Sequence, residues 1–213
     1  MVYRRTEKVE TRQADTRADI LDAARNQIAQ HGFGGASMSA IAREADVATG
    51  TLYRYFENKD ALFIATYKQL GEKEMDVIHR IATHSGPSSA VERLALAITT
   101  FISRALKSRR LSASLIGEPV SPQIDAARIK MRELHTDIYE RIIIDGIKAG
   151  SLPEQNTRIG ASAIAGAIVS VMAGPLAPEN RPVDAQQIDE ATKALITFCV
   201  AAIRPNRKSD IAF

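Results

Sequence analysis

The sequence lacks the features that mark several functional classes. It has one cysteine, Cys199, among 213 residues, so neither a disulfide within the chain nor a cysteine metal cage is possible. Tryptophan is absent and aromatic residues make up only 5%, which argues against an aromatic-lined nucleic-acid groove. The histidines show no metal-ligand spacing: His31, His79, His84 and His135. We therefore expect no metal site and no cofactor.

Signatures of catalysis are also missing. The chain shows no nucleophile–base pair, paired-carboxylate motif, phosphate loop or dinucleotide fingerprint. We expect that the protein is not an enzyme. The alternatives are an enzyme that uses a cavity in the C-terminal half, or a helical module that only dimerises.

The chain has only a slight excess of positive charge. The net charge is +3, from 28 basic and 25 acidic residues. Residues 1–60 contain nine of each and are neutral as a segment. Binding of any anionic partner by this segment must therefore rest on how side chains are arranged and not on bulk charge.

Long apolar runs are rare. Residues 1–13 are polar and charged with no apolar core, so no signal peptide is predicted and a cytoplasmic protein is expected. Residues 159–178 carry no charge over 20 positions, the length of a bilayer span. They are rich in Ala, Gly and Ser and contain Pro175, so we expect a helix buried on nearly every side within the protein, and no membrane association. A membrane span is the alternative.

What the sequence does contain is helical periodicity, so the predicted fold is all-α. Several helix starts are marked by capping residues: Thr16 with Asp19, Ser37, Asn58, and Ser89 with Glu92. Gly32 and Gly150 are expected helix stops. We predict two parts: residues 1–60, three short helices behind a flexible arm at 1–15, and residues 61–213, a larger helical domain.

The short helices near residues 38–45 and 49–56 are joined by about four residues, which is typical of a helix-turn-helix. The second helix of such a pair enters the DNA major groove. Leu52 and Phe56 are expected to point inward, and Gly50 lets the backbone approach DNA closely. The side chains left for DNA bases and phosphates are Thr49, Thr51, Tyr53 and Tyr55, with Ser37 and Lys59 at neighbouring helix starts.

The run Ala-Ser-Met-Ser-Ala-Ile-Ala-Arg-Glu-Ala-Asp-Val-Ala-Thr-Gly-Thr-Leu-Tyr-Arg-Tyr-Phe-Glu-Asn-Lys-Asp-Ala-Leu at 36–62 closely resembles the DNA-binding domain of TetR-family transcriptional regulators. The resemblance covers about a quarter of the chain. It implies a homodimer on a palindromic DNA operator, with repression relieved when an unknown small molecule enters the C-terminal domain. It also implies the DNA contacts Ser37, Arg43, Thr49, Gly50, Thr51, Tyr53, Tyr55 and Lys59.

Two positions depart from that family's pattern. Ala48 stands where a hydroxyl usually caps the recognition helix and contacts phosphate. Asp46 stands where glycine usually makes the turn; aspartate tolerates left-handed backbone angles better than most residues.

Two alternatives also stay open. Tyr53 and Tyr55 are either DNA contacts or half-buried packing residues, and the basic residues of the arm (Arg4, Arg5 and Arg12) either enter the minor groove or lie in solvent.

The last two helices are candidates for dimerisation. The first offers small residues, Gly160, Ala163, Gly166, Ala167 and Ser170, and the second an apolar seam, Ile188, Ala191, Leu195, Phe198 and Ala202. Core helices of a monomer are the alternative.

For the effector we expect a hydrophobic or amphipathic molecule among apolar side chains. Candidate polar anchors are Arg104, Glu118, Arg128, Arg132, His135 and Tyr139, with His79 and His84 as further possibilities.

Overall fold

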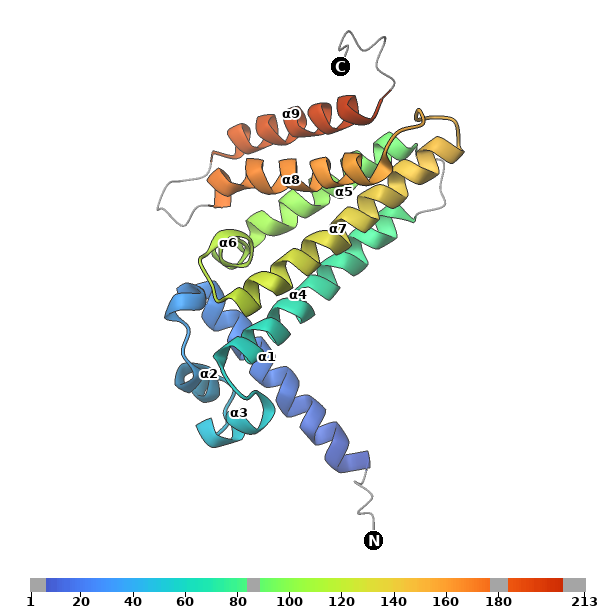
Figure 1. Ribbon diagram of the computed structural model, residues 1–213. Helices are drawn as coiled ribbons and strands as arrows, with labels where there is room; N and C mark the ends of the chain where they lie inside the picture. The colour runs from blue at the N-terminus through green and yellow to red at the C-terminus, as the bar shows by residue number, and fades with distance from the viewer. Residues whose placement is uncertain (1–6, 84–88, 177–183, 205–213) are drawn as a thin grey trace. The chain divides into compact units, whose positions relative to one another are not determined.

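The computed structural model describes residues 7–83, 89–176 and 184–204. All regular secondary structure in these three ranges is helical, which confirms the predicted all-α class there (Figure 1). The helices are α1 Glu7–Gly35, α2 Met38–Glu44, α3 Thr49–Tyr55, α4 Lys59–Ala82, α5 Ala90–Lys107, α6 Arg109–Gly117, α7 Pro122–Lys148, α8 Thr157–Leu176 and α9 Ala185–Ile203.

The start of α1 was predicted wrongly. The sequence pattern predicted a helix from about residue 17 with a cap at Thr16, but α1 already runs from Glu7 and the Thr16 hydroxyl donates to the carbonyl oxygen of Arg12 within the helix at 2.9 Å. Residues 7–15 contain no glycine or proline and several good helix formers, so nothing interrupts the helix there. The part of the expected flexible arm that the structure describes is therefore helical. Arg4 and Arg5 lie outside the described residues.

The other predicted caps are confirmed. The side chains of Ser37 and Asn58 accept backbone hydrogen bonds at the starts of α2 and α4, from Ala40 at 3.2 Å and from Ala61 at 2.8 Å. Ser89 forms a full capping box with Glu92 at the start of α5. Each of these side chains satisfies a backbone N–H that the first turn of a helix leaves without an intrahelical partner.

The chain forms two compact units. The first comprises residues 1–70 and 110–128, and the second comprises residues 71–109 and 129–213. The predicted division at residue 60 differs from this, because residues 110–128 pack with the N-terminal helices: Leu111 and Ile124 belong to the same buried cluster as the α1–α3 core. Helices α4 and α7 each supply residues to both units.

In the second unit, α8 packs on α9 and both helices contact α5 (Figure 1). The prediction that α8 is buried on nearly every side is wrong for the single chain. One face is buried, as Ile164, Ile168 and Met172 show, while the opposite face is exposed and carries mostly small residues. Within the described ranges α8 alone is long and apolar enough to cross a membrane, a test that core helices of soluble proteins also pass.

Helix α9 likewise has two faces. Leu195, Cys199 and Ile203 are buried, whereas Phe198 is 61% exposed. The predicted apolar seam is therefore divided, because Leu195 packs inside the chain while Phe198 and Ala202 point out. Burial raises the pKa of the Cys199 thiol to about 11, so this thiol is held in its less reactive neutral form.

Candidate DNA-binding surface and effector site

Helix α3 has the two-sided character expected of a recognition helix. Leu52 is fully buried and Phe56 is 5% exposed, as the sequence predicted. Thr49, Gly50 and Tyr53 are exposed on the other side. Tyr55 is half-buried and packs against the core of the first unit. Packing therefore accounts for most of Tyr55, whereas Tyr53 is 49% exposed.

The turn before α3 shows why the departures at Asp46 and Ala48 leave the fold intact. Asp46 adopts a φ of 51°, the left-handed region that glycine usually fills. Its backbone N–H bonds to the carbonyl of Arg43 at 3.3 Å, and the N–H of Val47 bonds to the carbonyl of Ala42 at 3.0 Å. Ala48 occupies the N-cap of α3 without a side-chain hydrogen bond. The first N–H groups of α3 consequently have no cap from a side chain.

Gly50 has no structural reason to be a glycine. A Cβ built at this position would meet no atom within 4 Å, and its φ does not lie in the left-handed region. Glycine in a helix weakens it by about 0.5–1 kcal/mol relative to alanine. The structure therefore leaves the backbone at this position open to a close approach from outside the chain.

The remaining predicted DNA contacts are Thr51 on α3 itself and Ser37, Arg43 and Lys59 on neighbouring segments. Ser37 and Arg43 are exposed, and Thr51 is half-buried. Lys59 is half-buried: its ammonium group donates weakly to the carbonyl oxygen of Gly34 at 3.4 Å and lies 5.3 Å from the centre of the Phe63 ring. These contacts hold the Lys59 side chain at the start of α4 and leave its ammonium group with spare donors.

Glu118, a predicted ligand anchor, belongs to the first unit and is already bonded there. From the turn between α6 and α7, its carboxylate accepts the backbone N–H groups of Phe33 at 3.0 Å and Gly34 at 2.8 Å. Burial alone would raise the pKa of Glu118, but the hydrogen bonds from Gly34, Ser114 and Phe33 and the charge of Arg128 together lower it. The side chain is therefore held as a carboxylate at the end of α1.

Arg128 also lies in the first unit. It is 8% exposed, donates to the carbonyl oxygen of Ser114, and lies over the Phe33 ring at 5.8 Å from its centre. Burial lowers its pKa, against the opposing charges of Tyr67, Asp125 and Glu118. Glu118 and Arg128 thus contact the end of α1, and neither belongs to the same unit as the other predicted anchors.

Four of the six predicted anchors lie in the second unit: Arg104, Arg132, His135 and Tyr139. Arg104 of α5 pairs with Glu74 of α4, at 2.5 Å between Nε and Oε2. His135 of α7 is half-buried, and its Nδ1 lies 2.9 Å from the carbonyl oxygen of Met131. Tyr139, one turn further along α7, is 1% exposed, and burial raises the pKa of its phenol. Burial also lowers the pKa of His135, against the hydrogen bond to Met131 and the charge of Glu74.

The other predicted anchors are exposed or undescribed. Arg132 and His79 are exposed on the surface, and His84 lies outside the described residues. Sequence reasoning missed two half-buried residues, Glu74 and Phe101, that interact with His135. Glu74 looks like any charged residue of an amphipathic helix, and Phe101 looks like an ordinary core position; yet the Phe101 ring meets His135 edge-on, 5.5 Å between centres.

The chain matches known proteins over most of its length. Residues 20–66 match the family model "Bacterial regulatory proteins, tetR family", and residues 87–173 match "Tetracyclin repressor-like, C-terminal domain". The fatty acid metabolism regulator protein of Bacillus subtilis (strain 168) is 32% identical over 139 residues, which are 63% of this chain and 70% of that protein. The chain belongs to the TetR family. It is therefore a DNA-binding transcriptional regulator and not an enzyme.

Other TetR-family proteins are similar over comparable lengths. The regulator UidR of Escherichia coli (strain K12) is 29% identical over 154 residues, covering 71% of this chain and 76% of that one. The crystal structure of FadR from Bacillus subtilis in complex with stearoyl-CoA has a TM-score of 0.73 at 22% identity, covering 88% of this chain and 99% of that chain. The structural likeness supports the fold. TetR-family regulators bind operator DNA and act as dimers with small-molecule effectors.

Proposed function

We propose that the protein is a cytoplasmic repressor that binds a palindromic operator as a homodimer and leaves it when a small hydrophobic or amphipathic molecule binds. The exposed side of α3 carries this proposal. Thr49, Gly50 and Tyr53 face outward from a helix whose inner side is fixed by Leu52 and Phe56. A rigid helix that presents small residues first and an aromatic hydroxyl next fits close entry into the major groove.

The proposed phosphate contacts surround this helix. Ser37 caps α2 and Lys59 begins α4, so a hydroxyl and an ammonium group mark two helix N-termini beside the recognition helix. Helix N-termini attract phosphate through their free N–H groups and their dipole. Arg43, Thr51 and Tyr55 complete the proposed set of contacts. This arrangement supports binding by a segment whose net charge is zero.

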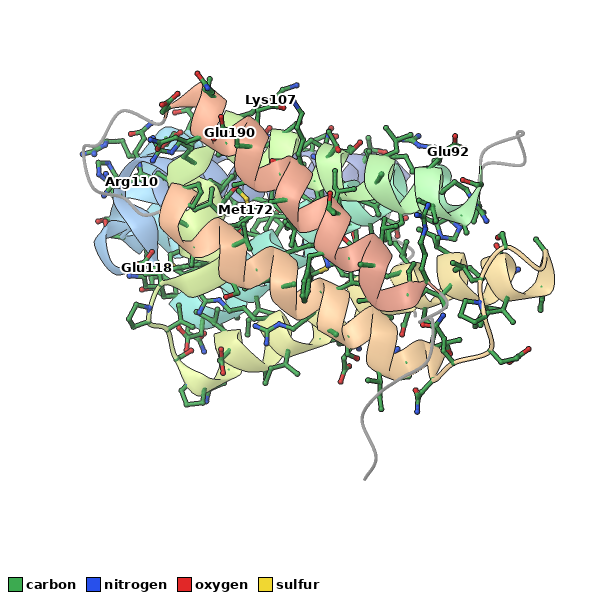
Figure 2. The ribbon with its side chains drawn as sticks, turned by 90° about the horizontal axis from the view of Figure 1, so that it is seen from above. Glu92, Lys107, Arg110, Glu118, Met172 and Glu190 are labelled. Atoms are coloured by element: carbon green, nitrogen blue, oxygen red, sulfur yellow. The ribbon has the colours of Figure 1, made fainter. Side chains whose placement is uncertain are left out.

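For the dimer we propose the outward faces of α8 and α9, which Figure 2 views from above. On α8 this face includes Ala163, Gly166 and Ser170, and on α9 it includes Phe198 and Ala202, all exposed in the single chain. Small residues let helices approach closely, and a large exposed aromatic side chain is typical of an interface core. A twofold dimer would place two α3 helices on successive major-groove half-sites, about 34–36 Å apart.

For the effector we propose the interior of the second unit, where His135 and Tyr139 supply polar groups among apolar side chains; Arg104, which is exposed, is linked to this site only through its ion pair with Glu74. Relief of repression requires that the effector binds the DNA-free form of the dimer more tightly than the DNA-bound form. Glu118, Arg128 and Arg132 stay outside this proposal, since the first two are bonded within the first unit and the third is exposed.

The test is fluorescence anisotropy on the DNA immediately upstream of the protein's own gene, across a salt series. We expect nanomolar affinity, a strong loss in Tyr53→Ala, and in Lys59→Ala a salt slope that is shallower by about 1.8, because the dimer loses two phosphate contacts at about 0.9 each. Lys68→Ala is the matched control, because Lys68 is an exposed lysine on the same helix but outside the proposed surface. Affinity equal to that for random DNA, both here and on fragments selected from the whole genome, would refute the proposed surface.

A further inference from the structure

Two buried hydrogen-bond acceptors in the second unit have no donor. Among the described residues, Glu74 Oε1 and His135 Nε2 are both shielded from solvent and have no hydrogen-bond partner. Glu74 lies on α4 and His135 on α7. An unpaired buried polar atom destabilises the folded chain, so native proteins rarely contain one without a reason.

The two acceptors lie in the same part of the bundle. Helices α4 and α7 come into close contact at Gly71, where an added Cβ would overlap the end of the Met131 side chain. Glu74 follows Gly71 by three residues and His135 follows Met131 by four, so both are one turn beyond this contact on their own helices. In agreement, the charge of Glu74 acts on the pKa values of both His135 and Tyr139.

The hydrogen bond made by the other ring nitrogen settles which role His135 Nε2 plays. Its Nδ1 lies 2.9 Å from the carbonyl oxygen of Met131, and a carbonyl can only accept, so Nδ1 carries the proton. Burial lowers the pKa of the ring and keeps it neutral. In a neutral ring protonated at Nδ1, the other nitrogen bears a lone pair. His135 Nε2 is therefore an acceptor, as is the carboxylate oxygen of Glu74.

The cluster is also balanced in charge. The second oxygen of Glu74 pairs with Arg104 Nε at 2.5 Å, and the His135 ring is neutral. Two unpaired acceptors in surroundings without net charge match an uncharged ligand that donates hydrogen bonds. The Phe101 ring, edge-on to His135, offers an apolar contact beside them. Met131 is unbranched and adaptable, so its side chain can move to admit a ligand.

We infer that the effector is an uncharged molecule with a hydroxyl group on an apolar body, an alcohol or a phenol, and that its single O–H proton is donated to His135 Nε2, with Glu74 Oε1 as the alternative acceptor. This inference rests on the proposed function, since it concerns the effector site of the same regulator. It excludes carboxylates as the preferred class, because a carboxylate would add a third acceptor to two that already lack donors.

The experiment compares matched probes on the full-length protein by isothermal titration. The probes are octanol and methyl octyl ether, para-propylphenol and para-propylanisole, octanoate and octylamine. Each hydroxyl compound should bind at least about tenfold more tightly than its methyl ether, and more tightly than the charged probes. Whichever of octanol and para-propylphenol binds more tightly shows whether the site prefers an alcohol or a phenol.

The variant His135→Phe keeps an apolar ring and removes the acceptor, so the preference for hydroxyl over ether should fall to about the level that Glu74 alone sustains. Because His135→Phe also removes an unpaired buried atom, it should fold. Glu133→Gln, an exposed position on the same helix, is the matched control and should keep the preference. On adding the preferred probe, the ¹⁵N signal of His135 Nε2 should move toward that of a hydrogen-bonded nitrogen.

Equal binding of a hydroxyl compound and its ether, tightest binding by octanoate or octylamine, or an unchanged preference in His135→Phe would each overturn the inference. If the ethers or charged probes bind and release operator DNA, the proposed function stands while the inference fails. If no probe binds at all, the inference fails too. The proposed function itself falls only if the operator binding test above also fails.

Discussion

The carboxylate of Glu118 accepts the backbone N–H of Gly34 at 2.8 Å across 84 residues of sequence. Its second oxygen accepts the N–H of Phe33 at 3.0 Å. The turn between α6 and α7 is thereby bonded to the end of α1. Buried side chains of α1 form one core with those of α2 and α3. Hydrogen bonds to a charged acceptor are worth about 1.5–3 kcal/mol, more than those between neutral groups.

Replacement of Glu118 by glutamine should lower the free energy of unfolding of the first unit by about 1–3 kcal/mol at neutral pH. The pKa of Glu118 is below its ordinary value of 4.5, so its contribution is complete above that value and is lost as the pH falls through the folded-state pKa. The unfolding free energies of the wild type and Glu118→Gln in urea should therefore converge as the pH falls below 4.5 and through the lowered pKa of Glu118. Glu133→Gln, an exposed control, should show no such convergence.

Gly32 lies directly beside this carboxylate. Its backbone has φ 71° and ψ 178°, a region that is almost confined to glycine, and an added Cβ would come within 2.7 Å of Glu118 Oε2. Gly32→Ala should lower stability by about 2 kcal/mol or more, with Glu118 displaced. Gly150→Ala is the control: its φ is 70° but its Cβ would meet nothing. Equal losses at the two positions, or full additivity of Gly32→Ala with Glu118→Ala, would contradict the steric coupling.

Local patterns in the sequence predicted the features that depend on neighbouring residues. The caps at Ser37, Asn58 and Ser89 and the inward positions of Leu52 and Phe56 follow from helical spacing and capping chemistry. The left-handed backbone at Asp46, which the prediction allowed at some cost, is likewise found.

Features that depend on distant partners were not predictable. Nothing near Glu118 in the sequence indicates that its partners are Phe33 and Gly34. The pairing of Glu74 with Arg104 joins α4 to α5, and the charge of Glu74 also acts on His135 of α7. The exposed face of α8 was missed for another reason: apolar and small residues look the same in sequence whether they are covered by their own chain or by a second copy.

Gly50→Ala should change stability and DNA affinity in opposite directions. The added methyl group meets nothing in the protein and favours the helix, so the free energy of unfolding should rise by up to about 1 kcal/mol. The same methyl group stands where the DNA approaches, so operator affinity should fall by about tenfold, or about 1.4 kcal/mol. Gly117→Ala, which also meets nothing, should leave DNA affinity unchanged. Unaltered affinity in Gly50→Ala would separate Gly50 from the DNA surface.

Phe198 tests how the chain assembles. Its side chain is 61% exposed on α9 and lies with small exposed residues of α8 and α9 on the proposed interface. Phe198→Glu should place two charges against each other at the twofold axis or bury one unpaired, at a cost of about 2 kcal/mol or more, and shift the sedimentation mass from twice 23.2 kDa to 23.2 kDa. The matched control is Leu96→Glu, since Leu96 is 55% exposed on α5 and outside the proposed interface. If Leu96→Glu dissociates the dimer while Phe198→Glu stays dimeric, the interface lies on α5 instead. The reason is that an exposed apolar side chain tolerates a charge only where no partner covers it.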